Sequence, residues 1–225
     1  MINDNEINVL VTAGGTNEYI DPVRYIGNCS TGKMGIEIAK AFSTFGYGIK
    51  VNLILGVTHL DVAYPNINVI RVVSAQDMYE ACQEFADSDI IVCAAAVADY
   101  KPKVKADQKI KKSDSNLTIE LERTVDILSE FGKHKKPGQF VVGFALETEN
   151  GYQNAKDKMI RKNADMIVLN TPTATTGFGT DTNQMTIIHN TEKFEHTLTP
   201  LISKTAAAKM LVEEIFKRVK HEQEA

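Results

Sequence analysis

The sequence has no uninterrupted apolar run long enough to cross a membrane. Its apolar stretches are broken within about ten residues, whereas a membrane-spanning helix needs roughly 20. The chain opens with Met-Ile-Asn-Asp-Asn-Glu-Ile-Asn, which is polar and acidic, unlike the basic and then apolar start of a secretory signal peptide. We therefore expect no membrane association and a cytoplasmic location.

Cysteines and paired metal ligands are also scarce. The three cysteines, Cys29, Cys82 and Cys93, are an odd number without metal-site spacing, which favours a reducing compartment over a disulfide scaffold. The five histidines are scattered, so no zinc site is predicted. Basic residues are not in excess: the net charge is −4 and the pI is near 5.8, which argues against a nucleic-acid-binding protein.

Length and patterning predict one α/β domain spanning residues 1–225. The 225 residues, 43% of them hydrophobic, are enough for one core and a small β annex. Strand-like and helix-like segments alternate, which is typical of a Rossmann-like, open and mostly parallel sheet with helices on both faces. The expected strands cover residues 7–12, 49–55, 67–73, 89–96, 117–121, 140–144 and 166–169. The expected helices cover residues 33–45, a segment starting at 74, and residues 126–131, 153–162 and 205–219.

Glycines and a long loop follow the first expected strand. Residues 17–29 have no clear strand or helix signal, and we expect an ordered, functional loop there. Residues 28–35 have two interpretations. They form either an anion cradle of backbone amides, or a tight turn with a helix cap by Ser30 or Thr31. This part of the sequence also has the Gly-x-x-x-x-Gly-Lys spacing of a P-loop. However, Met34 stands where a Ser or Thr is required and no predicted strand runs directly into Gly27, so we reject a P-loop.

Three polar or glycine-rich segments, 14–33, 95–112 and 144–162, are expected at the carboxyl edge of the sheet, where ligands bind in this class. The second has six lysines against one aspartate between residues 101 and 112, and is either a solvated loop or a basic flap that closes over phosphates. In the third, Lys158 and Lys162 lie one helical turn apart, where like charges cost roughly 0.2–0.5 kcal/mol. They form either an exposed basic face or an anion site. The residues alone predict a polyanionic ligand of nucleotide size and no reaction type.

Six strings of sequence resemble the phosphopantothenoylcysteine synthetase family. They follow one another along nearly the whole chain: VTAGGT (11–16), DPVRYI (21–26), NCSTGKMG (28–35), AAVADY (95–100), KIKK (109–112) and VGFA (142–145). The resemblance implies a ligase of coenzyme A biosynthesis that joins 4'-phosphopantothenate to L-cysteine. In the bacterial type, CTP with Mg²⁺ activates the carboxylate as an acyl-cytidylate and pyrophosphate is released. The resemblance also implies a homodimer. Because the sequence begins directly at the synthetase strand, we expect a monofunctional chain without the flavin decarboxylase domain of the bifunctional proteins.

The same resemblance assigns roles to residues. Asn28 matches the asparagine that holds the acyl-cytidylate, where its amide hydrogens would be donors, and Ala96 matches a second substrate-binding position. Lys109 matches a flap lysine needed for activation. The positions that match the nucleotide site are Gly14, Gly15, Ser30, Thr31, Gly32, Lys33, Cys93, Ala94, Ala95, Asp99, Lys109, Asp126, Ile127, Phe144, Lys158 and Lys162. The chain departs from the family at 124–125, where Thr-Val replaces the common Asn-Pro, and the metal ligands stay unassigned.

Two other functions stay open. An NAD(P)-dependent oxidoreductase would share the fold, but the first glycine turn lacks the full Gly-x-Gly-x-x-Gly fingerprint, and residues 54–57 lack the acid that binds a ribose. A non-catalytic nucleotide-binding module would bind the triphosphate and release no pyrophosphate. The residues do not decide between CTP and ATP, because base selection depends on backbone groups and pocket width.

Overall fold

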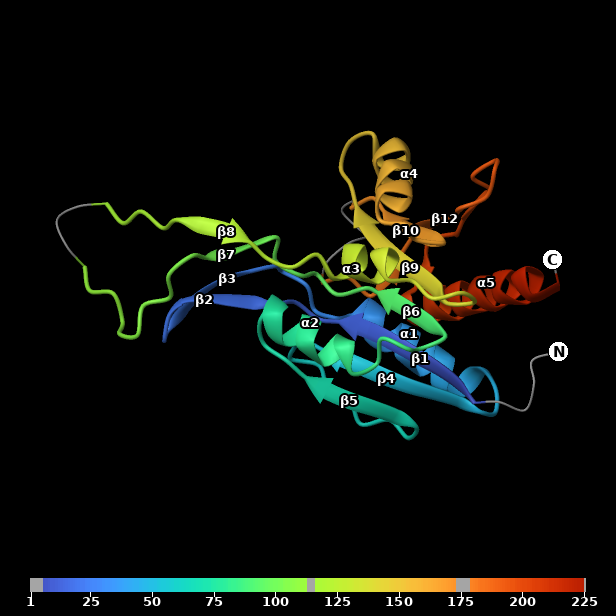
Figure 1. Ribbon diagram of the computed structural model, residues 1–225, viewed down its shortest axis with the longest axis horizontal. Helices are drawn as coiled ribbons and strands as arrows, with labels where there is room; N and C mark the ends of the chain where they lie inside the picture. Colours follow the sequence, from blue (N-terminus) through green and yellow to red (C-terminus); the bar gives the residue numbers. More distant parts are fainter. Residues whose placement is uncertain (1–5, 113–115, 173–178, 225) are drawn as a thin grey trace.

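The computed structural model describes residues 6–112, 116–172 and 179–224. It consists of a body, built on one large sheet, and an arm that projects from one end of the body (Figure 1). The arm comprises residues 17–27, 100–112 and 116–123, and its strands form two antiparallel ribbons. No described helix is both long enough and apolar enough to span a membrane.

The body confirms the predicted α/β fold. In the described chain, eight strands form one sheet in the order β13-β12-β10-β9-β6-β1-β4-β5. Six neighbouring strands pair in parallel: β10, β9, β6, β1, β4 and β5. Strands β12 and β13 add antiparallel pairs at the β10 edge. Their bounds are Ile7–Ala13 (β1), Ile49–Leu55 (β4), Ile67–Arg71 (β5), Ile90–Cys93 (β6), Phe140–Leu146 (β9), Met166–Asn170 (β10), Met185–His189 (β12) and His196–Leu198 (β13). The strand order reverses between β1 and β6, and ligands in such sheets bind outside the carboxyl ends at that point.

Helices bury both faces of the sheet. Helices α1 (Lys33–Phe45) and α5 (Lys204–Glu224) cover one face, and α2 (Ala75–Gln83), α3 (Ile127–Lys133) and α4 (Gly151–Arg161) cover the other. Successive side chains of β1 therefore enter different cores: Val9 and Val11 pack with α1 and α5, and Leu10 packs with α2, α3 and α4. The expected capping box at the start of α2, between Ser74 and Asp77, is confirmed.

The expected cap of α1 by Ser30 or Thr31 is wrong. Gly32 occupies the cap with a left-handed φ of 75°, and no side chain caps the helix. A Cβ at Gly32 would lie 3.0 Å from the Cα and N of Gly14, so the close approach of two backbones requires glycine there. The Ser30 Oγ instead accepts a hydrogen bond from the Gly32 N–H at 3.2 Å.

The arm corrects two expectations. Residues 17–29 form a hairpin of β2 (Asn17–Asp21) and β3 (Arg24–Gly27) rather than an irregular loop, because the buried Asp21 carboxylate accepts the backbone N–H groups of Val23 and Arg24 and closes the turn. The expected strand 117–121 lies instead at β8 (Leu121–Arg123), which pairs with β7 (Tyr100–Pro102).

A strand does end at Gly27, contrary to the expectation used against a P-loop. However, β3 is a ribbon strand outside the large sheet, and Met34 still stands where a Ser or Thr is required, so the P-loop remains rejected. A further ribbon that the sequence did not predict pairs β11 (Thr182–Asn183) with β14 (Ile202–Ser203), directly before α5.

Candidate active site

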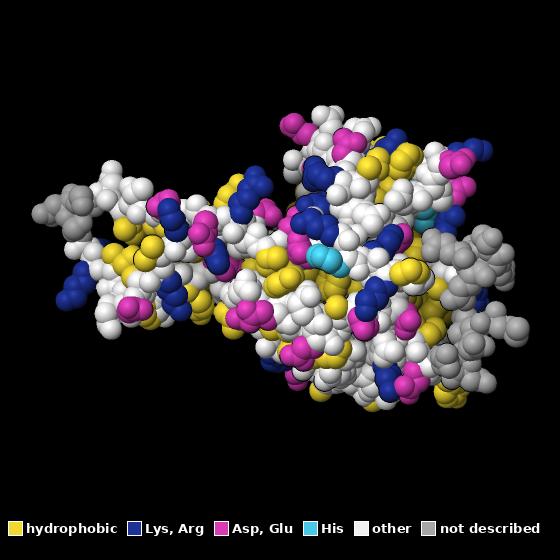
Figure 2. Space-filling view, viewed as in Figure 1, with side chains coloured by type: hydrophobic (Ala, Val, Ile, Leu, Met, Phe, Trp, Pro, Cys, Tyr) yellow, Lys and Arg dark blue, Asp and Glu magenta, His cyan; other side chains and the backbone are white. Residues whose placement is uncertain are grey.

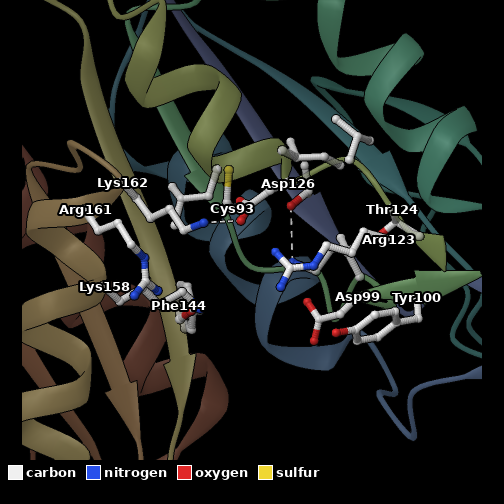
Figure 3. A pocket seen from close by; sticks show the side chains of 16 residues that line it. Cys93, Asp99, Tyr100, Arg123, Thr124, Asp126, Phe144, Lys158, Arg161 and Lys162 are labelled. Carbon is white, nitrogen blue, oxygen red and sulfur yellow. Dashed lines mark hydrogen bonds and ion pairs between the residues drawn. The ribbon is translucent and has the colours of Figure 1, made fainter.

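Two adjoining pockets lie at the carboxyl edge of the parallel strands. The larger, about 650 Å³, is the α3–α4 pocket; Asp126 and Lys162 line it (Figure 3). The smaller, about 360 Å³, is the α1 pocket; Asn28 and Lys33 line it. The two pockets share Ala95, Val97, Asp99, Phe144 and Lys158. They therefore form two parts of one site, at the switch point that the strand order predicts.

Helix α4 supplies a cationic wall to the α3–α4 pocket. Figure 3 shows Lys158, Arg161 and Lys162 on one side and Asp99 with Arg123 on the other. The three cations share a wall because residues three and four apart lie on one helix face. Figure 2 shows basic side chains over α4, and others along the arm among acidic ones. The wall is suited to bind an anion.

Lys158 is the cation common to both pockets. Its Nζ donates to the backbone carbonyl of Phe144 at 2.8 Å. Burial lowers the pKa of Lys158 from its ordinary value, and the charges of Asp126 and Glu147 oppose that effect. A partly desolvated ammonium interacts more strongly with an anion than one in bulk water, so Lys158 is a strong candidate for ligand binding.

Asp126 joins α3 to this wall. Its carboxylate caps α3 by accepting the backbone N–H of Ser129 at 2.9 Å, and it forms an ion pair with Lys162. Burial alone would raise the pKa of Asp126, but the hydrogen bond from Lys162, the Ser129 amide and the nearby lysine charges outweigh it and lower the pKa. Asp126 is therefore ionised.

Cys93 lies in the same pocket and is no nucleophile. Burial, followed by the negative charge of Asp126, raises the pKa of the Cys93 thiol to about 12, although Lys158 opposes the shift. A thiol with this pKa stays protonated at neutral pH, and the thiolate is the reactive form. Cys93 therefore serves as part of the pocket wall.

The α1 pocket lies against the start of α1. The first-turn amides of a helix lack intrahelical acceptors, so this end of α1 carries partial positive charge. Lys33 lines the pocket and forms an ion pair with Asp181. Lys204, the first residue of α5, also lines it. This region favours an anion, and the cradle interpretation of residues 28–35 fits it better than the side-chain cap.

Asn28 lies in the wall of the α1 pocket, as the resemblance predicts. Its Nδ2 donates to the carbonyls of Ala96 and Val97, both at 3.1 Å. In the structure its amide hydrogens bond to the backbone, and donation to an intermediate stays a prediction. Asn28 thereby holds the 96–97 segment, which forms one wall of the α1 pocket.

The structure brings together most of the expected site residues. Four of them line both pockets: Ala95, Asp99, Phe144 and Lys158. The α1 pocket adds Asn28, Ser30, Thr31, Gly32, Lys33, Ala94 and Ala96, and the α3–α4 pocket adds Cys93, Asp126, Ile127 and Lys162. Three expected residues line neither of these pockets: Gly14, Gly15 and Lys109.

The structure explains why each of these three residues lies outside the two pockets. Gly14, at φ 85°, packs against Gly56, where a Cβ would lie 2.9 Å from a backbone carbon; it belongs to the close-packed floor under the site. Gly15 pairs with residue 57 through backbone hydrogen bonds. Lys109 lies in the arm, because the adjacent Ile110 donates its N–H to Asp21 at 3.1 Å.

Sequence reasoning missed several lining residues. They are Tyr100, Arg123, Arg161, Asn170, Asn183 and Lys204. The spacing of Arg161 from Lys158 on α4 was a usable signal. Asn170 ends the sheet strand β10, and the β11–β14 ribbon brings Asn183 and Lys204 to the pocket, so no local signal marks these three residues. No cluster of three or more His, Cys, Asp or Glu side chains suitable for a metal occurs among the described residues.

Comparisons with known proteins agree with the resemblance found in the sequence. The sequence model of the family described as "DNA/pantothenate metabolism flavoprotein C-terminal domain" matches residues 5–219. The crystal structure of the C-terminal domain of Coenzyme A biosynthesis bifunctional protein CoaBC superposes with a TM-score of 0.79 at 37% identity, covering 97% of this chain and 99% of that one. The predicted fold and family are confirmed.

Two curated relatives are longer proteins. Coenzyme A biosynthesis bifunctional protein CoaBC of Haemophilus influenzae is 45% identical over 213 residues, which is 94% of this chain and 52% of that protein. A protein named Cysteine/Cysteine sulfinic acid decarboxylase, from an unknown prokaryotic organism, is 48% identical over 194 residues, which is 83% of this chain and 53% of that protein. The chain thus spans about half the length of these relatives.

Proposed function

The chain belongs to the DNA/pantothenate metabolism flavoprotein C-terminal domain family, and from this premise we propose that it is a phosphopantothenate–cysteine ligase of coenzyme A biosynthesis that acts in the cytoplasm. The reaction joins 4'-phosphopantothenate to L-cysteine and converts CTP to CMP and pyrophosphate. The observation that carries the proposal is the pair of adjoining pockets that share Asp99, Phe144 and Lys158. Two reactants must meet at one centre, and two connected pockets with a cation between them suit that task.

The reaction has two steps. In the first, a carboxylate oxygen of 4'-phosphopantothenate attacks the α-phosphorus of CTP, the bond to the bridging oxygen of the β-phosphate breaks, and pyrophosphate leaves with the electron pair. In the second, the cysteine amine attacks the acyl carbon, the bond from that carbon to the CMP oxygen breaks, and the amine loses a proton. The first step brings two anions together, so cations must offset their repulsion. Lys33 and Lys158 have the position for that role.

The two pockets divide the substrates in this proposal. The nucleoside and α-phosphate occupy the α3–α4 pocket between Phe144 and the α4 cations, and the other phosphates extend past Lys158 toward the start of α1. The acyl group lies beside Ala96 in the α1 pocket. Asn28 acts by holding the wall at Ala96 and Val97, as its two hydrogen bonds suggest. Its replacement by Asp would place a carboxylate against two carbonyl oxygens and displace that wall.

The residues present also fit Mg²⁺. This ion is commonly held by one or two carboxylates together with substrate phosphates, so a full cluster of protein ligands is not required. Asp99 lines both pockets, whereas Asp126 is already paired with Lys162. Asp99 is therefore the residue that would hold the ion, which supplies neutralisation of phosphate charge when bound.

A homodimer would complete the site. The arm exposes a group of apolar side chains: Val23, Tyr25, Tyr100, Val104, Leu117 and Leu121. Large exposed apolar groups gathered on a projecting element favour a protein interface, and a second copy is the partner that the family resemblance implies. In this arrangement the arm of one protomer closes over the pockets of its partner and carries Lys109 there.

A pyrophosphate-release assay tests the function. The protein is incubated with 4'-phosphopantothenate, Mg²⁺ and either CTP or ATP, with and without cysteine. We expect release that depends on CTP and on 4'-phosphopantothenate, followed by CMP when cysteine is added. Binding without release would support a nucleotide-binding module instead. Release with ATP in preference to CTP would contradict the choice of nucleotide. In a separate incubation with NAD(P) alone, hydride transfer would support the oxidoreductase.

A further inference from the structure

The segment of residues 96–99 forms a wall common to the two pockets. Ala96 lines the α1 pocket, and Val97 and Asp99 line both pockets. The segment lies after β6 and before β7, so contacts other than a strand ladder hold most of its backbone. The groups that hold this segment therefore decide where the shared wall lies.

Residues at the base of the arm hold this segment. Thr16, directly before β2, accepts the backbone N–H of Ala98 on its Oγ1 at 2.9 Å. Asn28, directly after β3, donates to the backbone carbonyls at positions 96 and 97. The strand β7 begins directly after Asp99. The arm therefore joins the body at the wall that the two pockets share.

Thr124, directly after β8, supplies a further contact to the same segment. Its hydroxyl donates to the Ala98 carbonyl, and its backbone N–H donates to the Asp99 carbonyl at 3.0 Å. Thr124 also lines the α3–α4 pocket. Ala98 is thus held at its N–H by Thr16 and at its carbonyl by Thr124. Because Ala98 is buried, loss of either partner would leave a backbone group poorly compensated by water.

The contacts of Ala98 determine the position of the next residue, Asp99. Asp99 is exposed, so its carboxylate is placed by the backbone that carries it rather than by close packing. Figure 3 shows Asp99 and Thr124 on one side of the pocket and Lys158 on the other. Burial lowers the pKa of Lys158, and Asp99 is among the charges that oppose this effect. The carboxylate therefore acts on the cation that both pockets share, and a shift of the backbone at Ala98 would change that interaction.

We propose that Thr124 is a positioning residue, which clamps the Ala98 peptide from the base of the arm and thereby sets the Asp99 carboxylate at the junction of the two pockets. This inference rests on the proposed function for the identity of the ligand. Thr124 belongs to the arm base and to the pocket wall, so it connects the placement of the arm with the geometry at Asp99. Its effect on nucleotide binding depends on that carboxylate, because the hydroxyl itself is used by the backbone.

Hydrogen exchange in the protein without ligand tests the clamp. Thr124→Val removes the hydroxyl at nearly the same volume, and Thr124→Ser keeps it. Thr44→Val is the matched control, because the Thr44 hydroxyl donates to the Lys40 carbonyl at 3.0 Å and Thr44 lines neither pocket. We expect Thr124→Val to raise the exchange rate of the Ala98 amide about 3- to 10-fold, and the other two variants to match the wild type. Protected β1 amides show that each variant is folded, and unchanged exchange at Ala98 in Thr124→Val overturns the clamp.

A double-mutant cycle tests whether Thr124 acts through Asp99. Isothermal titration with Mg²⁺ measures the Kd of CTP for the wild type, Thr124→Val, Asp99→Asn and the double variant. We expect Thr124→Val to weaken CTP about 3- to 10-fold in the wild-type background, and by less than about twofold in the Asp99→Asn background, where no carboxylate is left to misplace. Thr124→Ser should bind CTP like the wild type. Equal losses in the two backgrounds overturn the positioning role.

The possible results separate this inference from the proposed function. CTP binding that depends on Thr124 only when Asp99 is present, in a protein that releases no pyrophosphate from any nucleotide, supports the positioning role and contradicts the ligase. CTP-dependent release with the same Kd for CTP in Thr124→Val and the wild type supports the ligase and overturns the positioning role. A protein that binds neither CTP nor ATP overturns both.

Discussion

The body and the arm of this protein owe their order to different interactions. In the body, the central strand contributes Val9, Leu10 and Val11 with no exposed surface, and helices cover both faces of the sheet. In the arm, every residue of β8 is exposed. An isolated two-stranded ribbon is marginally stable in water. The body is therefore ordered by its core, whereas the exposed β8 strand of the arm depends mainly on polar contacts.

The polar contacts of the arm are of two kinds. Ion pairs join Lys101 to Glu122 at 3.5 Å and Lys103 to Glu120 at 2.7 Å, and exposed pairs of this type contribute about 0–1 kcal/mol each. The buried Asp21 carboxylate fastens the β2–β3 turn to residue 110. These pairs also use two lysines of the 101–112 run, so that run is less basic than its sequence suggests. The pockets therefore belong to the buried body, whereas the arm carries exposed strands held by polar contacts.

The largest effect is expected from a charge in the body. Lys158→Met should lower kcat/KM for pyrophosphate release by about 10²- to 10³-fold, because it removes the cation shared by both pockets. Lys156→Met is the control. Lys156 is on the same helix, but its Nζ lies over the Phe194 ring, 3.9 Å from the ring centroid. Steady-state kinetics and a thermal melt check both variants. Equal activity of Lys158→Met and Lys156→Met would place binding outside the body's pockets.

A packing change in the body should reduce global stability. At Gly35 an added Cβ would lie 2.6 Å from the Ala13 Cβ and 3.0 Å from the Thr12 carbonyl, so Gly35→Ala should cost about 1–3 kcal/mol of unfolding free energy. At Gly46, just after the same helix, nothing lies within 4 Å of an added Cβ. Gly46→Ala should stay within about 0.5 kcal/mol of the wild type. Urea titrations compare the two, and similar losses would show that packing beneath α1 does not limit stability.

The smallest effect is expected from a polar change in the arm. The Arg24 hydrogen bond and the Val23 and Ile110 amides hold the pKa of Asp21 well below its usual range, although burial opposes them. Asp21→Asn should lower hydrogen-exchange protection of arm amides about tenfold and leave β1 amides unchanged. Loss of protection throughout the body would contradict independent ordering of the arm.

The direction of the Asp21 shift also predicts a dependence on pH. Because its pKa is depressed in the folded protein, the stabilisation is present above the unfolded pKa, near 4, and is lost as the pH falls through the folded pKa. In the wild type, arm protection should therefore persist below pH 4 and then decline. The Asp21→Asn protein should lack this decline, and exchange measured along a pH series shows whether it does.

The sequence predicts the body better than the arm for a physical reason. Strands buried on both faces leave continuous apolar runs, so β1 and β9 were found within a few residues of their observed bounds. The arm strands are exposed and polar, and the turn at Asp21 resembles an ordinary loop until its hydrogen bonds are known. The hydrophobic pattern of the sequence therefore predicts buried strands well and exposed strands poorly.

The site residues were also predicted unevenly, because local spacing marks some of them and long-range pairing places others. The spacing of Lys158 and Lys162 in and directly after α4 predicts that they lie side by side, and the family resemblance assigned them to the nucleotide site. Lys204 was missed because its place in the pocket depends on the pairing of β11 with β14. The family resemblance identified Asn28, but only coordinates show that its amide hydrogens are used by backbone carbonyls.

One measurement tests directly whether the arm of one protomer completes the body of another. Asn28→Asp damages a pocket, and Lys109→Ala damages an arm; each protein alone should be dimeric and nearly inactive. When equal amounts are dissociated and mixed, half of the dimers become mixed, and each has one site with an intact pocket and an intact partner arm. Pyrophosphate release should then recover to about a quarter of the wild-type rate. Mixed dimers no more active than the separate variants would contradict the account.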